Sequence, residues 1–311
     1  MTAFVVRRLL QSAVLLVVVT TASFFLVRLT PGGPEAALIN NPRLGPGQVE
    51  RLRQRFGLDD PVPTQYVRWV GSISHLDFGL SYTYARPATE VIGERLWPTL
   101  QLGLASYAIA LLGIPLGAYA AMHHRGYGDL AVRVGTTVSH AMPSWWLGLS
   151  AIVLLNGLTG WFPNGPSSEG PVEWFKAIIL PAVVLGLGAT VSFSRFVRSE
   201  VLETLRQDYV RTAHAKGLPA PRVGSAHVLR NALMPVITLL GYLLPAVLSG
   251  ALITEYVFGW PGIGRLFYEA TTSRDYPILM ALLTLTTVAT IIGTLLADIG
   301  YGLVDPRIRY S

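Results

Sequence analysis

Long apolar runs recur along the chain and are separated by shorter polar segments. A helix needs about 20 mostly apolar residues to cross roughly 30 Å of hydrocarbon. Six runs meet that length, so we predict an all-α polytopic membrane protein with six transmembrane helices. The predicted spans cover residues 9–29, 96–122, 134–158, 175–193, 233–258 and 278–304.

The first run has a second interpretation, because Arg7 and Arg8 precede it as basic residues precede the apolar part of a secretory signal peptide. The run is long enough to span the membrane, however, and no small-residue cleavage site precedes Thr30 and Pro31. We therefore expect an uncleaved first span.

Basic residues are distributed unevenly between the connecting segments. If the N-terminus is cytoplasmic, the inner segments hold 13 arginines and lysines, whereas the short outer loops hold only Lys176, Arg265 and Arg274. The long outer segment at 30–95 holds seven more, but loops beyond about 60 residues are translocated largely regardless of charge. The positive-inside rule therefore predicts that both termini are cytoplasmic.

Composition supports the membrane interpretation. Hydrophobic residues make up 51% of the chain and charged residues 14%, whereas soluble domains carry about 25% charged residues. A chain this apolar would not stay disordered in water. Its lack of cysteine excludes disulfides, thiolate metal ligands and cysteine nucleophiles.

The sequence lacks the motifs for ATP hydrolysis and for common hydrolase chemistry. A phosphate-binding P-loop needs Gly-Lys-Ser/Thr, but the only two lysines, Lys176 and Lys216, follow Phe175 and Ala215. There is also no HExxH zinc motif and no GxSxG nucleophile elbow. We therefore expect no enzymatic activity, no metal site and no cofactor in this chain.

Residues 30–95 form the long outer segment. It opens with Pro/Gly turn signals, which are followed by a polar stretch of helical spacing at 48–56 and by an amphipathic run at 66–76. We predict a small helical cap on the outer face.

Residues 195–232 form the long inner segment, with seven basic and three acidic side chains. We predict a helix that begins at Ser199 as its N-cap and ends where Gly217 follows Lys216. Its apolar stripe consists of Val201, Leu202, Leu205, Tyr209 and Ala213. A second short helix is expected from about 222 to 234, where Pro235 opens the fifth span.

Two interpretations of this inner segment are open. A basic amphipathic segment can rest on anionic lipid, or it can dock on a partner protein. The small residues Ala213, Ala215 and Gly217 at the end of the helix favour a partner, because they let another backbone approach closely, whereas a lipid anchor would carry Trp, Phe or Leu there.

Few ionisable or helix-breaking residues lie inside the predicted spans. His140 and Glu255 are the ionisable candidates for a translocation pathway, although a helix-packing hydrogen bond is the simpler explanation for His140. Pro143 and Pro245 are candidates for gating, with static packing as the alternative. The centre of the membrane layer is otherwise nearly neutral, which argues against proton coupling.

A family resemblance rests on motifs spread over the chain. DYVRTAHAKGL (208–218) and HVLRNALMPVIT (227–238) together resemble the EAA-type loop of binding-protein-dependent ABC importer permeases, in particular the dipeptide, oligopeptide and nickel subfamily. Further segments that resemble this subfamily are RRLL (7–10), RFGLDDPVPTQY (55–66), DFGLSY (77–82), IPLG (114–117), EYVFGWPGIGRLFYEA (255–270), RDYP (274–277) and DPRIRY (305–310). The resemblance therefore covers almost the whole chain.

The resemblance implies a type I ABC importer transmembrane fold in which a cytoplasmic loop at about 199–234 couples to an ATPase. By position it assigns to this coupling loop Leu205, Tyr209, Arg211, Thr212, Ala213, Lys216, Gly217 and Leu218. Arg211 and Thr212 replace the first two residues of the Glu-Ala-Ala motif, and Pro235 lies farther beyond Gly217 than in sugar importers. Both departures resemble the peptide and nickel branch.

The resemblance also implies a division of the chain and a set of partners. Residues 1–95 would hold the first span and the outer segment, 96–305 the permease domain of five helices, and 306–311 a cytoplasmic tail. The implied partners are a second permease subunit, two ABC ATPase subunits that bind ATP and Mg, a solute-binding protein and the lipid bilayer of the bacterial inner membrane, with no nucleic acid. The solute-binding protein would face residues 30–95 and the loop from Trp260 to Pro277.

The implied function is the passage of dipeptides or oligopeptides through half of a translocation pathway by alternating access. A nickel complex or another metal chelate is the alternative cargo. An ion-coupled secondary transporter is the alternative of a different class.

Overall fold

The computed structural model describes residues 2–29, 60–163, 165–166, 170–219, 222–233 and 251–304, together with single residues at 47, 50, 51, 54, 57, 59, 236 and 247. Every regular element among these residues is a helix, apart from one isolated bridge between Leu80 and Pro87. The prediction of a helical fold is confirmed for this part of the chain.

Four helical segments of the described residues are long and apolar enough to cross a membrane. They are Leu10–Leu29 in α1 (Thr2–Leu29), Ala88–Met122 in α5 (Ala88–Ala110) and α6 (Gly113–Met122), all of α10 (Pro171–Thr204), and Tyr276–Leu296 in α18 (Tyr276–Val304). They correspond to the first, second, fourth and sixth predicted spans. The predicted fifth span at 233–258 falls mostly outside the described residues.

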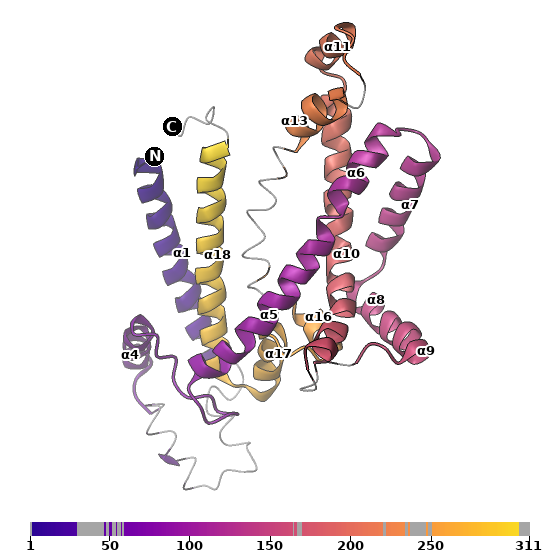
Figure 1. Cartoon of the computed structure of the whole chain (residues 1–311). Helices are drawn as coiled ribbons and strands as arrows, with labels where there is room; N and C mark the ends of the chain where they lie inside the picture. Colours follow the sequence, from indigo (N-terminus) through magenta and orange to yellow (C-terminus); the bar gives the residue numbers. More distant parts are fainter. Residues whose placement is uncertain are drawn as a thin grey trace.

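The predicted third span at 134–158 is not one continuous helix. Its place is taken by α7 (Tyr127–Ala141), α8 (Ser144–Ala151), the π-helical turn η1 (Ile152–Asn156) and α9 (Gly157–Thr159). The two halves are together long and apolar enough to span, but they meet at 96° (Figure 1). Pro143 stands at the break with φ −59° and ψ 137°, which is extended backbone. The described residues thus support four spans, or five if this bent pair is a broken span and not a re-entrant loop.

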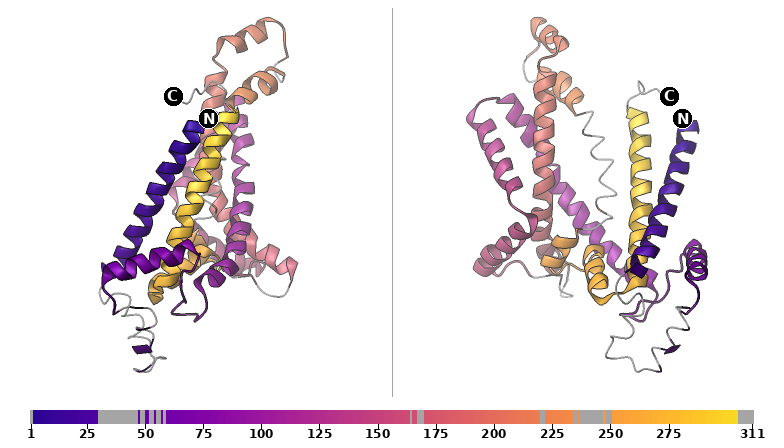
Figure 2. Two further views of the ribbon diagram at one scale, coloured as in Figure 1. Left: turned by 90° about the vertical axis from the view of Figure 1, so that its left-hand side faces the viewer. Right: turned by 180° about the vertical axis from the view of Figure 1, so that it is seen from behind.

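The long helices lie in two groups, shown in Figures 1 and 2. α1 and α18 lie side by side, and α10 packs against α5 and α6. α1 begins and α18 ends at one end of the molecule, where α11 (Asp208–Ala215) and α13 (Arg230–Ala232) also lie. We call this end the terminal face. The other end, the opposite face, holds α4 (Val62–Ser74), α16 (Leu252–Val257) and α17 (Ile263–Ser273).

α5 and α6 form one long segment with a local interruption at Leu111 and Leu112. Pro115 has no amide hydrogen to donate to the carbonyl of Leu111, and its ring crowds that carbonyl. Both interrupting residues keep helical backbone angles, so the segment continues in the same direction.

Small residues bring α6 and α10 into backbone contact. A Cβ added to Gly113 would overlap the carbonyl oxygen of Thr190, and one added to Gly117 would overlap that of Ser194. Both glycines belong to the Gly-xxx-Gly spacing that permits close helix packing in membranes. α10 is thereby held close to α6 along its half nearer the terminal face.

A helix of the predicted cap is found as α4, which packs on the end of α1 nearer the opposite face, while its predicted place outside the membrane stays a prediction. The ring of Phe24 lies 5.2 Å from that of Tyr66 and 5.3 Å from that of Trp69, measured between centroids. The hydroxyls of Thr21 and Tyr66 are 2.7 Å apart. The predicted polar helix at 48–56 falls mostly outside the described residues.

Candidate functional site

The inner segment begins with a break in α10. The helix ends at Thr204, the amide of Leu205 donates to the carbonyl of Val201 at 2.9 Å, and α11 begins at Asp208 after an extended Gln207. The predicted single helix from Ser199 to Lys216 is therefore wrong, because α10 runs past Ser199. The polar run at 206–208 interrupts the apolar period and divides the predicted stripe between two helices.

α11 has one buried face and one exposed face. Val210 and Ala213 are buried against Val223 and Val228 of the π-helical segment η2 (Val223–Leu229). Leu205 and Leu218 are half-buried at the edge of the same cluster. The other residues of the predicted coupling loop are exposed: Tyr209, Arg211, Thr212, Lys216 and Gly217. Tyr209 was expected in the buried stripe, but its side chain lies on the exposed side, where its hydroxyl accepts a 3.0 Å hydrogen bond from Asn231.

Gly217 ends α11 in the way the sequence predicts. It has φ +76°, its amide donates to the carbonyl of His214 at 2.9 Å, and the amide of Leu218 donates to that of Ala213 at 3.3 Å. This pair of bonds is a Schellman motif, whose left-handed residue is usually glycine. A Cβ at Gly217 would meet nothing within 4 Å, so the backbone angle and not lack of space favours glycine here.

The chain then returns toward the membrane helices. The predicted second short helix is found as η2 followed by α13, while its predicted end at Met234 and Pro235 lies outside the described residues. α11, η2 and α13 therefore form a compact unit at the terminal face (Figure 1). We call it the coupling unit, after the role that the family resemblance implies for this segment.

A partly buried ion pair anchors α10 just before the coupling unit. Arg198 donates to both carboxylate oxygens of Asp129 at the start of α7, with distances of 2.7 and 2.9 Å. The amide of Arg125 donates to the same carboxylate at 3.0 Å, and the guanidinium of Arg133 lies 3.6 Å from it. Such bidentate pairs are strong and geometrically specific. The sequence analysis missed this pair, because its members lie 69 residues apart.

Replacing Asp129 with alanine is expected to lower the free energy of unfolding by about 2 kcal/mol. Loss of one partner leaves the other charge partly buried and unpaired, and the cost is below that of a deep pair because the Arg198 side chain is 21% exposed. The fall in the melting temperature of the purified chain measures this loss of stability. Asp208→Ala is the control, because Asp208 is exposed and lies 3.6 Å from Arg211; an equal loss in both variants would contradict the anchoring role.

Among the predicted pathway residues, Glu255 lies beside a cavity inside the helix bundle. The cavity has a volume of about 190 Å³ and lies between α5, α10 and the start of α16. Its polar lining consists of Thr99, Ser106, Tyr107 and Glu255. A polar side chain in an otherwise apolar span is the signal that would have identified the three residues of α5.

The carboxylate of Glu255 is 0% exposed and is held by two hydrogen bonds. The hydroxyl of Thr99 donates to Oε1 at 3.0 Å, and the backbone amide of Arg265 donates to Oε2 at 3.0 Å. The same hydroxyl accepts a 2.7 Å hydrogen bond from the amide of Ile263. Glu255 thus joins α5 and α16 to the start of α17.

The other predicted pathway residues do not gather at this cavity. His140 is exposed in the last turn of α7, and Pro143 stands at the break before α8. Pro245 lies outside the described residues. No cluster of three or more potential metal-ligating His, Asp or Glu side chains occurs in the described part of the chain.

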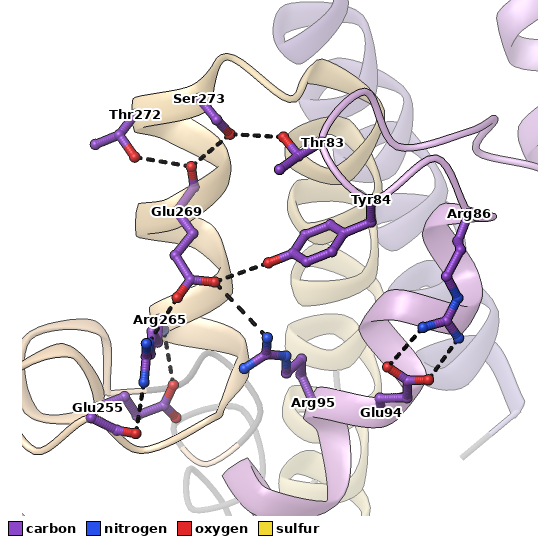
Figure 3. Close-up of polar contacts among 11 residues, drawn as sticks. Thr83, Tyr84, Arg86, Glu94, Arg95, Glu255, Arg265, Glu269, Thr272 and Ser273 are labelled. Atoms are coloured by element: carbon purple, nitrogen blue, oxygen red, sulfur yellow. Dashed lines mark hydrogen bonds and ion pairs between the residues drawn. The ribbon is translucent and has the colours of Figure 1, made fainter. Parts of the chain in front are cut away.

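A second polar network lies at the opposite face and is drawn in Figure 3. Glu269 of α17 accepts hydrogen bonds from Arg265 at 2.8 Å and from the hydroxyl of Tyr84 at 3.1 Å, and Arg95 of α5 lies 4.0 Å away. Partial burial and the neighbouring Glu269 raise the pKa of Tyr84, so its phenol keeps the proton that it donates. The hydroxyl of Thr83 donates to Ser273 at 3.2 Å. α17 is thereby tied to the loop at 75–87.

The same loop is fixed to the junction of α17 and α18. The carboxylate of buried Asp275 accepts hydrogen bonds from the hydroxyl of Ser81 and from the amide of Thr83. The loop expected to face a partner at 260–277 is therefore largely packed. Trp260 itself is 0% exposed, and its indole donates to the carbonyl of Pro98 at 2.9 Å, whereas Tyr268 and residues 271–274 of the same segment are exposed, so the contact of this loop with a partner stays a prediction.

Comparisons with known proteins match this chain to transport permeases over its whole length. The family model described as binding-protein-dependent transport system inner membrane component matches residues 113–310, and the model for the N-terminal part of such components matches residues 1–103. The oligopeptide transport system permease protein AppB of Bacillus subtilis is 38% identical, and a protein named as a peptide transport system permease of Brucella abortus is 36% identical. A protein of Sinorhizobium fredii named as a peptide ABC transporter permease is 34% identical. Each alignment covers 100% of both chains.

Proposed function

Because this chain belongs to the family of binding-protein-dependent transport system inner membrane components, we propose that it is the permease subunit of an ATP-driven importer of peptides. As a member of that family it is a multi-pass protein of the inner membrane. The observation that carries the peptide assignment is the full-length similarity to permeases that are named for peptide or oligopeptide transport. The cargo would pass by alternating access, and the chain would supply half of the pathway.

The coupling unit is the proposed contact with the ATPase. Its buried side, Val210 and Ala213, rests on the core that also contains Val197 and Val201 of α10. Its other side presents Arg211, Thr212 and Lys216 at the tip of the terminal face. A displacement of α11 would therefore be transmitted through this shared core to α10, which lines the cavity at Glu255.

The remaining parts of the assembly follow from this proposal. The terminal face would be cytoplasmic, and ATP and Mg would bind to two ATPase subunits there. A second permease subunit would complete the pathway, and a solute-binding protein would deliver peptide at the opposite face. Residues 1–95 would then form the first span and outer segment, 96–305 the permease domain, and 306–311 a cytoplasmic tail.

Arg211→Glu tests the coupling assignment. The side chain of Arg211 is 76% exposed, so the charge reversal should leave the melting temperature unchanged. It should lower ATP-dependent peptide uptake by the reconstituted complex at least tenfold, the equivalent of losing about 1.4 kcal/mol at the contact. The control is Arg7→Glu, at an exposed arginine of the terminal face that lies on α1, outside the coupling unit. Normal uptake and normal ATPase association in Arg211→Glu would refute the assignment.

A further inference from the structure

A second cavity lies at the opposite face, between α1, α4, the loop at 75–87 and the start of α18. Its volume is about 210 Å³. Since a water molecule takes about 30 Å³ in the liquid, this equals roughly seven waters, on the order of the size of one amino acid. The cavity shares no lining residue with the one at Glu255.

One wall of this cavity is apolar and firmly packed. Phe24, Phe78 and Tyr276 are buried residues of the lining, and Pro277 and Met280 continue it along α18. The ring of Trp69 packs against that of Phe24 with an interplanar angle of 35°. A preformed apolar wall of this kind accommodates an apolar or aromatic ligand group.

A positive charge is fixed beside that wall. The guanidinium of Arg28 lies 4.4 Å from the ring centroid of Phe24 and donates to the amide oxygen of Gln65. Gln65 is 7% exposed and in turn donates to the backbone carbonyl of Asp60 at 2.6 Å. Arg28 is thus held in one place, and a guanidinium has five N–H donors in a planar fork suited to a carboxylate.

A negative charge and a further donor also line the cavity, together with Arg68, whose charge is paired with that of Asp60 at 2.7 Å. Asp77 is exposed at the cavity, and its Oδ1 accepts a 2.9 Å hydrogen bond from the amide of Gly79, which orients the carboxylate. The indole nitrogen of Trp69 is buried and has no hydrogen-bond partner among the described residues. Buried donors are normally satisfied, so an acceptor on a ligand would remove an unfavourable state.

From these placements we infer that the cavity binds a zwitterionic amino acid with an apolar side chain. Its carboxylate pairs with Arg28, its ammonium with Asp77, and its side chain lies against Phe24 and Phe78. A simple anion would be repelled by the carboxylate of Asp77. A purely apolar ligand would pair with neither Arg28 nor Asp77. The inference rests on the cavity alone and does not depend on the proposed import of peptides.

The test is equilibrium binding of radiolabelled L-leucine to the full-length chain in phosphatidylcholine nanodiscs. We expect saturable binding that Arg28→Gln and Asp77→Asn each weaken about tenfold or more, the effect of losing one charge-assisted contact. N-acetyl-leucine, which lacks the ammonium, should bind equally to wild type and Asp77→Asn. Asparagine keeps the oxygen that Gly79 binds, so Asp77→Asn should fold even if Arg28→Gln does not.

Arg86→Gln is the matched control, because Arg86 is an exposed arginine of the same face outside the cavity lining. Absence of saturable leucine binding to wild type, or equal leucine binding by wild type and Asp77→Asn, overturns the inference. Arg28-dependent retention of phosphatidylethanolamine without leucine binding would identify a lipid as the occupant and overturn it as well. None of these outcomes depends on peptide uptake, so the proposed function is judged separately.

Discussion

Replacing Glu255 with alanine is expected to lower the free energy of unfolding by about 3 kcal/mol, or several degrees in melting temperature. The variant leaves two donors without an acceptor, the buried hydroxyl of Thr99 and the partly buried amide of Arg265. Each orphaned donor costs about 1–3 kcal/mol. Glutamine should not restore stability fully, because it replaces one accepting oxygen with an NH₂ group that faces a donor.

Two further variants test whether the loss of stability comes from the hydrogen bonds of Glu255 or from the removal of a carboxylate as such. Thr99→Val keeps the shape of the side chain but removes the hydroxyl that links Ile263 to Glu255, and should lose a similar amount of stability because the amide of Ile263 loses its acceptor and the carboxylate of Glu255 loses a donor. Glu94→Gln, at an exposed carboxylate paired with Arg86, should be nearly neutral. A Glu255→Ala variant as stable as Glu94→Gln would show that the two hydrogen bonds do not hold α16 and α17 in place.

Hydropathy predicted the long helices well, because a membrane span is determined by composition over about 20 residues. It could not place breaks within a run. The 96° bend at Pro143 and the end of α10 at Thr204 both depend on a few residues inside segments that are apolar or periodic as a whole. The proline was noticed in the sequence, but its effect ranges from a slight kink to a full break, and only packing decides between them.

The hydrogen-bonded residues around Asp275 and Glu255 were harder to predict than the helices. Ser81 and Asp275 belong to two motifs, DFGLSY and RDYP, that the sequence analysis quoted separately, and the structure joins them by a hydrogen bond. Glu255 was selected as an ionisable residue near a span, yet its partners Thr99 and Arg265 come from other helices. Tertiary pairs of this kind leave no local spacing pattern in a single sequence.

A single methyl group at the contact of α6 and α10 is expected to be as damaging as the loss of Glu255. In Gly117→Ala the new Cβ would overlap the carbonyl oxygen of Ser194 and lie 3.1 Å from the amide of Arg198. Both obstacles are backbone atoms of a long helix, which cannot turn aside as a side chain does. We expect a loss of about 3 kcal/mol in unfolding free energy, at the upper end of overpacking effects.

The control is Gly188→Ala on α10 itself, where an added Cβ would meet nothing within 4 Å of the described residues. Alanine is favoured over glycine in a helix by about 1 kcal/mol, so this variant should melt at the same or a higher temperature than wild type. Both variants replace glycine with alanine. Changes of opposite sign in their melting temperatures would therefore isolate the effect of the contact between α6 and α10. Because Ser194 and Arg198 lie on the stretch of α10 that leads into the coupling unit, Gly117→Ala should also reduce peptide-stimulated ATP hydrolysis in the assembled complex. A Gly117→Ala variant that melts like Gly188→Ala would show that α6 and α10 can separate without cost.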